Sequence, residues 1–182
     1  MDLINSERLV LRRWRATDRD PFARLNADAI VMEHFLSALD RAESDAFADR
    51  IEAGFATNGY GLWAVEVPGE AEFIGYVGLA LATFDAHFTP AVEVGWRLAR
   101  NYWGRGFATE AARAAVTDGF DRVGLKEIVS FTVPGNVRSR RVMEKLGMRY
   151  AEDFEHPLID PQHPLRRHVL YRLPRAEWSS TR

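Results

Sequence analysis

Two glycines, Gly104 and Gly106, stand just before an alanine-rich stretch with the composition of a helix, and a β-branched segment, 92–98, precedes them. Glycine lets backbone N–H groups approach a ligand closely because it carries no Cβ. The first N–H groups of a helix lack partners within the helix and lie at the positive end of its dipole. The sequence therefore predicts a strand, a glycine loop and a helix that together bind a phosphate or pyrophosphate.

The glycine loop departs from two common phosphate-binding patterns. A dinucleotide-binding loop requires Gly or Ala three residues after the second glycine, and Thr109 stands there. A P-loop ends in Gly-Lys-Ser/Thr, and this loop contains no lysine. Two glycines alone leave an alternative open: the segment is only a turn followed by the start of a helix, and it binds no ligand.

The longer stretch of residues around the two glycines favours a ligand-binding loop. Residues 102–111 read Tyr-Trp-Gly-Arg-Gly-Phe-Ala-Thr-Glu-Ala and resemble the pyrophosphate-binding segment of the GNAT superfamily of acetyl-CoA-dependent N-acetyltransferases, in the form familiar from its RimJ/RimL-like branch. Gly106 and Ala108 fill the two small positions of the family signature, whereas Trp103 stands where Gln or Arg is usual. A second block, 136–148, is similar to the family's Asn-x-x-Ser-x-x-Val-Met-x-Lys-Leu-Gly-Met segment. The resemblance therefore covers nearly the whole chain.

The composition is that of an ordinary soluble protein. The chain has 182 residues, of which 47% are apolar and 27% charged, with a formal net charge of −2 and no cysteine. This predicts one domain, 1–182, in the cytoplasm, without disulfides and without a nucleic-acid or membrane partner. The spacing of His156, His163 and His168 matches no common ligand set, so no metal site is predicted.

Hydrophobic periodicity and turn residues predict a single mixed α/β sheet with the order β-α-α-β-β-β-α-β-α-β-β. The GNAT fold has the same order, and the resemblance implies that its two central strands splay apart. The predicted strands are 8–13, 62–67, 73–80, 91–98, 128–133, 148–153 and 168–173. Four helices are predicted. The first begins near Thr17, and the second has an apolar face formed by Phe47, Ile51 and Phe55. The third follows the glycine loop, and the fourth follows Asn136.

The resemblance implies that acetyl-CoA is bound between the splayed strands, with no metal. Gly95 suits a β-bulge in the first of them. Main-chain groups of 96–98 would bind the pantetheine amides, and loop N–H groups would bind the pyrophosphate. Asn136 either contacts the far side of the cofactor or only caps a helix. The implied cofactor-binding residues are Trp96, Arg97, Leu98, Gly104, Arg105, Gly106, Phe107, Ala108, Thr109 and Asn136.

Two residues are candidates for the chemistry of acyl transfer, which needs a neutral amine and an acid for the leaving thiolate. Glu93 stands just before the pantetheine-binding residues and is the candidate base, acting directly or through water; a carboxylate on a solvated strand face is the alternative. Many family members have a tyrosine where this chain has Met143. The resemblance to RimL-like enzymes, which have a serine three residues after the asparagine, makes Ser139 the candidate hydrogen-bond relay to the sulfur. Ser139 shares a helix face with Asn136, and an ordinary first-turn serine is the alternative.

The resemblance implies an N-acetyltransferase that moves an acetyl group from acetyl-CoA to a primary amine by direct attack in a ternary complex. The RimJ/RimL-like resemblance implies a protein or peptide N-terminus, or a small amine, as the acceptor. Its pocket is expected near 32–35 and 84–90. An acyl-CoA-binding sensor with little or no turnover is the alternative, favoured only by Met143. The oligomeric state stays open, with a homodimer among the choices.

Overall fold

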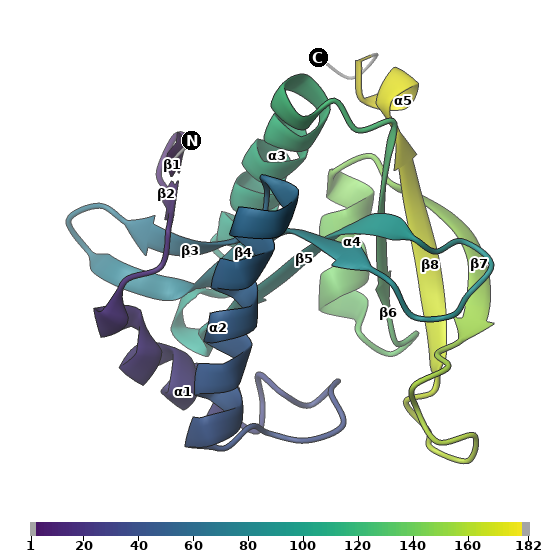
Figure 1. Ribbon diagram of the computed structural model, residues 1–182, viewed down its shortest axis with the longest axis horizontal. Helices are drawn as coiled ribbons and strands as arrows, with labels where there is room; N and C mark the ends of the chain where they lie inside the picture. The colour runs from purple at the N-terminus through teal and green to yellow at the C-terminus, as the bar shows by residue number, and fades with distance from the viewer. Residues whose placement is uncertain (1–2, 180–182) are drawn as a thin grey trace.

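The computed structural model describes residues 3–179, which contain one eight-stranded mixed sheet in the order β1-β2-β3-β4-β5-β6-β8-β7 (Figure 1). Neighbouring strands are antiparallel except β5 and β6, which are parallel. The predicted mixed α/β fold is confirmed. The strands are β1 (Leu3–Asn5), β2 (Val10–Arg12), β3 (Leu62–Val67), β4 (Ala71–Ala82), β5 (Ala91–Leu98), β6 (Glu127–Thr132), β7 (Arg149–Glu155) and β8 (Arg167–Pro174), and the helices are α1 (Arg19–Ala27), α2 (Arg41–Asn58), α3 (Phe107–Asp118), α4 (Val137–Lys145) and α5 (Arg175–Ser179).

Helices cover both faces of the middle of the sheet. On one face of β5, Arg97 contacts α1 through Asn26 and α2 through Phe47. On the other face, Val94 lies opposite Leu79 of β4, which packs beneath the end of α3. Successive side chains of a strand point to opposite faces. Alternate residues of β5 therefore face either α1 and α2 or α3.

The first two helices begin at positions that differ from the prediction. α1 starts at Arg19 after a 3-10 turn, and Thr17 does not cap it. The carboxylate of Asp18, which stands at the cap position, instead accepts two hydrogen bonds of 2.8 Å from Arg12 in a buried ion pair. α2 starts six residues before Phe47 because Asp40 and the third helical residue form a capping box. β1, which pairs with β2, was not predicted.

β5 and β6 are joined at a single residue pair, Glu93 opposite Val129. Next to this pair, the hydroxyl of Ser130 donates a hydrogen bond of 2.9 Å to the carbonyl oxygen of Val94. A side chain thus takes a backbone acceptor at the point where the two strands separate. The predicted splay of the central strands is confirmed, and Figure 1 shows them running in different directions.

The bulge predicted at Gly95 is wrong for the pairing of β5 with β4. That pairing keeps one register along its length, and Gly95 lies directly opposite Gly78. A Cβ at Gly95 would meet only the Oε1 atom of Glu93, at 4.0 Å. The glycine therefore leaves an open surface beside Glu93 rather than bending the strand.

Gly78 should be intolerant of a side chain, because a Cβ there would lie 2.1 Å from the carbonyl oxygen of Gly61 in the neighbouring backbone. We expect Gly78→Ala to lower the free energy of unfolding by about 2 kcal/mol or more, since overpacking against backbone forces strands apart. Gly54 in α2 is the matched control, with nothing within 4 Å of its Cβ position. Gly54→Ala should raise stability by about 0.5–1 kcal/mol. Urea unfolding of both variants checks this, and equal stabilities would contradict it.

Candidate active site

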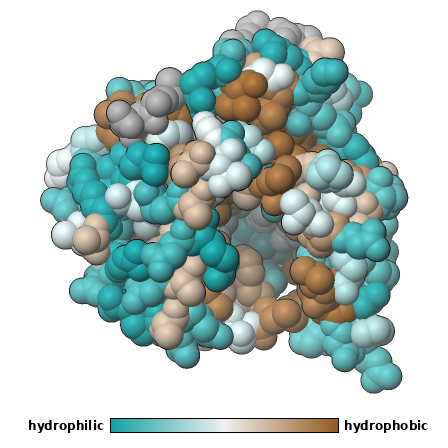
Figure 2. All heavy atoms as spheres, viewed as in Figure 1, coloured by the Kyte–Doolittle hydropathy of each residue, from teal (hydrophilic) through white to brown (hydrophobic). Residues whose placement is uncertain are grey.

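A cavity of about 1070 Å³ opens over the point where β5 and β6 part. Figure 2 shows the hollow near the centre of this face of the molecule. Its walls come from β5, the start of α3, the first turns of α4 and two loops, 30–39 and 156–165. The predicted site residues that line it are Glu93, Trp96, Arg97, Leu98, Gly104, Gly106, Phe107, Ala108, Thr109, Asn136 and Ser139.

The glycine loop has the backbone geometry of an anion cradle. Gly104 and Gly106 have φ values of +74° and +83°, which side chains rarely allow. α3 begins at Phe107, and its first intrahelical hydrogen bond runs from the N–H of Glu110 to the carbonyl of Gly106, at 3.0 Å. Within residues 3–179, the N–H groups from Gly104 to Thr109 have no backbone acceptor. These groups therefore remain available to a phosphate.

Two side chains of the loop, those of Trp103 and Arg105, brace it against other parts of the chain. The indole N–H of Trp103 donates a hydrogen bond of 2.7 Å to the carbonyl of Leu98, so this carbonyl is already engaged. The guanidinium of Arg105 forms two hydrogen bonds, of 2.5 and 2.8 Å, with Glu70 in the β3–β4 turn. The side chain of Arg105 is consequently not part of the cavity wall, and the binding of a pyrophosphate by its backbone N–H group stays a prediction.

Glu110, in the first turn of α3, fastens the N-terminal segment to the cradle. Its carboxylate accepts hydrogen bonds from the backbone N–H of Arg8 at 2.7 Å and from the hydroxyl of Ser6 at 2.8 Å. Burial alone would raise the pKa of Glu110, but these hydrogen bonds and the Arg8 charge outweigh it and lower the pKa. The carboxylate is therefore held in its charged form near the positive end of the helix dipole.

Glu93 lies in the cavity wall in an environment that disfavours its charged form. Its carboxyl group is half-buried and forms no hydrogen bond with any other part of the chain between residues 3 and 179. Burial raises the pKa of Glu93 to about 8. The carboxyl group leans along the strand toward Gly95. A group with such a pKa can accept or release a proton near neutral pH.

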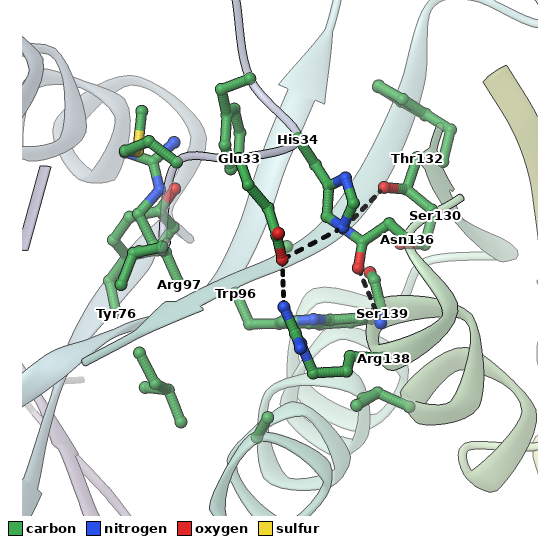
Figure 3. Close-up of a pocket in the computed structure, with 18 of the residues that line it drawn as sticks. Glu33, His34, Tyr76, Trp96, Arg97, Ser130, Thr132, Asn136, Arg138 and Ser139 are labelled. Carbon is green, nitrogen blue, oxygen red and sulfur yellow. Dashed lines mark hydrogen bonds and ion pairs between the residues drawn. The ribbon is translucent and has the colours of Figure 1, made fainter. Parts of the chain in front are cut away.

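The start of α4 presents a capped helix end and a free hydroxyl. The Oδ1 atom of Asn136 accepts a hydrogen bond of 3.2 Å from the N–H of Ser139, and its Nδ2 group donates one of 3.1 Å to Thr132 (Figure 3). The N-cap interpretation of Asn136 is confirmed. The hydroxyl of Ser139 has no hydrogen-bond partner among the described residues and lines the cavity. Met143 is fully buried in the main core and is not part of the cavity wall.

One of the two segments predicted for the acceptor pocket lines the cavity. Glu33 lies between His34 and Arg138 and forms an ion pair with the arginine, which also lies 4.4 Å from the Trp103 ring (Figure 3). The other segment, 84–90, is absent from the wall because Phe88 packs into an aromatic cluster under β6 and β7. The loop that follows β7 takes its place, and sequence reasoning treated that loop only as a connection.

Two histidines close the far end of the cavity. The rings of His156 and His168 lie 5.1 Å apart, and burial lowers the pKa of both, so they are mainly neutral at pH 7.

Between residues 3 and 179 no group of three potential metal ligands comes together. None of the helices in the same range has the length and apolar character needed to cross a bilayer.

The sheet divides between two parallel strands, and a glycine loop and a helix N-terminus border the cavity at the division. Comparison with known proteins defines the class further. The acetyltransferase (GNAT) domain matches residues 8–149. The chain therefore belongs to the GNAT acetyltransferase family.

Three proteins illustrate its relationships. FsC-acetyl coenzyme A-N(2)-transacetylase of Aspergillus fumigatus is 33% identical over 66% of this chain, which spans only 52% of that relative's length. An acetyltransferase (GNAT family) from Bacillus anthracis has the same fold, with a TM-score of 0.80, 24% identity, and coverage of 96% of this chain and 99% of that one. Mycobacterium smegmatis RimJ, solved with CoA-disulfide, aligns with a TM-score of 0.74 and 20% identity over 95% and 87% of the two chains.

Replacing Glu93 with glutamine should remove a pH-dependent loss of stability. An unperturbed glutamate ionises near pH 4.5, whereas Glu93 in the folded protein has a pKa of about 8. Between these values the folded state holds a proton that the unfolded state has released, so stability falls as pH rises. Relative to wild type, Glu93→Gln should gain stability from about pH 5 to 8 and show no pH-dependent gain below pH 4.

Urea unfolding at pH 4, 6 and 8 and constant ionic strength measures this trend. Glu7→Gln is the control, because it removes an exposed carboxyl group away from the cavity. A constant difference in stability between Glu93→Gln and wild type at all three pH values would show that the carboxyl group is not desolvated.

Proposed function

We propose that this protein transfers the acetyl group of acetyl-CoA to a primary amine by direct attack in a ternary complex, with Glu93 as the base. The single observation that carries the proposal is the unbonded, half-buried carboxyl group of Glu93 at the fork between β5 and β6. The glycine loop and the loop 30–39 line the cavity at that fork. Membership of the acetyltransferase family supports the same reaction.

The residues around the fork fit acetyl-CoA. Beyond Glu93, β6 no longer pairs with β5, so residues 96–98 pair with β4 on one side and border the cavity, with no strand, on the side that faced β6. Such groups can bind the amides of the pantetheine arm, as a missing strand would. The N–H groups from Gly104 to Thr109 would bind the pyrophosphate. When bound, acetyl-CoA supplies a thioester carbonyl carbon that an amine can attack.

The protein's part in the reaction is to move protons and exclude water. Glu93 accepts a proton from the amine, directly or through one water, as the nitrogen–carbon bond forms and the carbon–sulfur bond breaks. The hydroxyl of Ser139 donates a hydrogen bond to the departing sulfur and relays to it a proton from solvent. Glu93 then returns its proton to solvent. The products are an amide and the free thiol of CoA.

The acceptor we propose is an N-terminal α-amine of a protein or peptide, or a small-molecule amine. An α-amine has a pKa near 8, so a sizeable fraction is neutral close to the pKa of Glu93. The RimJ/RimL-like form of the 102–111 run supports a peptide acceptor. The Aspergillus relative is named as an N(2)-transacetylase, which supports transfer to nitrogen.

Glu93→Gln should lower kcat/KM by about 10²–10⁴-fold at pH 8, the usual contribution of a positioned base. Because Glu93 acts in its charged form, the wild-type rate should rise with pH through about 8, and the variant should lose that part of the rise. CoA thiol release from pH 6 to 10, with peptides and polyamines as acceptors, measures both effects. Unchanged turnover at every pH would remove Glu93 from the mechanism. Binding of acetyl-CoA without release on any acceptor would favour a sensor instead.

Gly106→Ala should weaken CoA binding about tenfold by titration calorimetry, because alanine disfavours the φ of +83° that aims the loop N–H groups. Gly124→Ala is a matched control, since Gly124 has a φ of +80° beyond the opposite end of α3. The control should lose similar stability and keep its CoA affinity. Equal CoA affinity in the two variants would separate the glycine loop from cofactor binding.

A further inference from the structure

Arg97 places a charge in the cavity that the described residues do not neutralise. Its side chain lies on the face of β5 that points toward α1 and α2, lines the cavity and is only 7% exposed. Within residues 3–179 no carboxylate oxygen comes within the 4.0 Å of an ion pair with it. Buried charges in proteins are normally paired, because desolvating a lone charge is costly. Arg97 is an exception, and a bound anion would supply the partner that the chain does not.

The groups that hold Arg97 are all neutral. Its Nη1 group donates a hydrogen bond of 2.6 Å to Asn26, which is fully buried and donates one of 2.9 Å to Ser44. The rings of Phe35 and Tyr76 lie 4.2 and 5.5 Å from the guanidinium carbon (Figure 3). Ring faces stabilise a cation. They fix the position of the guanidinium but leave its full positive charge in the cavity.

The unpaired edge of this guanidinium matches a carboxylate. Nε of Arg97 is buried without a hydrogen-bond partner, and Nη2 forms no hydrogen bond within the described part of the chain. These two groups donate in parallel from one edge, and Arg edges of this kind bind the two oxygens of a carboxylate together. Asn26 holds the remaining nitrogen and so fixes the direction of the free edge.

The spacing along β5 relates this edge to the proposed reaction centre. Glu93, Gly95 and Arg97 share one face of the strand, and Glu93 leans toward Gly95. Two residues of a strand span about 7 Å. Because the Glu93 carboxyl group lies over Gly95, two residues before Arg97, an amine beside that carboxyl group is at least roughly 7 Å along the strand from a group bound at Arg97.

Building on the proposed acetyl transfer, we propose that Arg97 binds a carboxylate of the acceptor, so that the acceptor is a primary amine with a carboxylate several bonds from its nitrogen. The α-carboxylate of a free amino acid lies too close to its own amine to span this distance. An ω-amino acid spans it, and so does a peptide N-terminus followed by an acidic side chain. Both sources offer the same chemistry to Arg97.

Two matched pairs of acceptors test the proposal and separate the sources. The first pair is 6-aminohexanoate and its amide; the second is a tetrapeptide with Glu or Gln as the second residue. Wild type should show at least a tenfold higher kcat/KM for the charged member of one pair, and the pair that responds identifies the source. Equal kcat/KM within both pairs would overturn the role of Arg97 while leaving the acetyl transfer itself intact.

Arg97→Gln should reduce the charged-to-neutral ratio of kcat/KM to about one. Arg100→Gln is the matched control, since it removes a positive charge from an exposed position three residues further along and outside the cavity wall. The control should keep the wild-type ratio. Asn26→Ala removes the hydrogen bond but keeps the charge, and it should retain a preference for the charged acceptor. A ratio that persists in Arg97→Gln would contradict the proposal.

Calorimetry with CoA present gives a readout that needs no turnover and no variant. The wild-type protein should bind hexanoate, which has no amine to acetylate, at least tenfold more tightly than hexanamide. Failure of every acceptor to release thiol, together with this binding preference, would count against the acetyl transfer and support the carboxylate site. Equal affinity for the two compounds would overturn the site.

Discussion

The separation of β5 from β6 is the constraint on which the site depends. The two strands share one residue pair, and the hydroxyl of Ser130 takes the carbonyl of Val94 beside it. From there the edge of β5 borders the cavity with no strand beside it, although unpaired backbone groups are costly away from water. The same divergence leaves Glu93 in the fork, enclosed enough for its pKa to rise. Cofactor groove and candidate base are thus two results of one break in the hydrogen-bond ladder.

Buried arginines differ in their partners: Arg12, outside the cavity, is paired with carboxylates, and Arg97, inside it, is not. Arg12 is 5% exposed and is paired with both Asp18 and Glu66, as expected for a buried cation. Arg97 is almost as buried and has only neutral neighbours. Glu93, on the same strand face, is kept largely uncharged by burial at neutral pH. The cavity floor therefore carries a net positive charge, in a chain whose formal net charge is −2.

Features that depend on neighbouring residues could be predicted from the sequence. The glycine loop, the Asn136 cap and the central strands are determined by short patterns, and the structure contains all three. The errors involve residues far apart in the chain. Phe88, in the segment 84–90 that was expected in the acceptor pocket, packs instead against Phe131 and Phe154, and the side chain of Arg105 pairs with Glu70 in another hairpin. No local pattern carries such contacts, nor the lone charge of Arg97, which becomes apparent only once its surroundings are assembled.

In the loop before α3, the groups proposed to bind the pyrophosphate belong to the backbone, and the groups that brace the loop belong to side chains. The backbone at Gly104 and Gly106 lines the cavity, while the indole of Trp103 bonds to Leu98 and the guanidinium of Arg105 to Glu70 in the β3–β4 turn. Ligand affinity then depends on backbone shape, which many sequences can share, so side chains at these positions can drift as long as some brace survives. Trp103 in place of Gln or Arg is an instance of that freedom: a different residue secures the same curve.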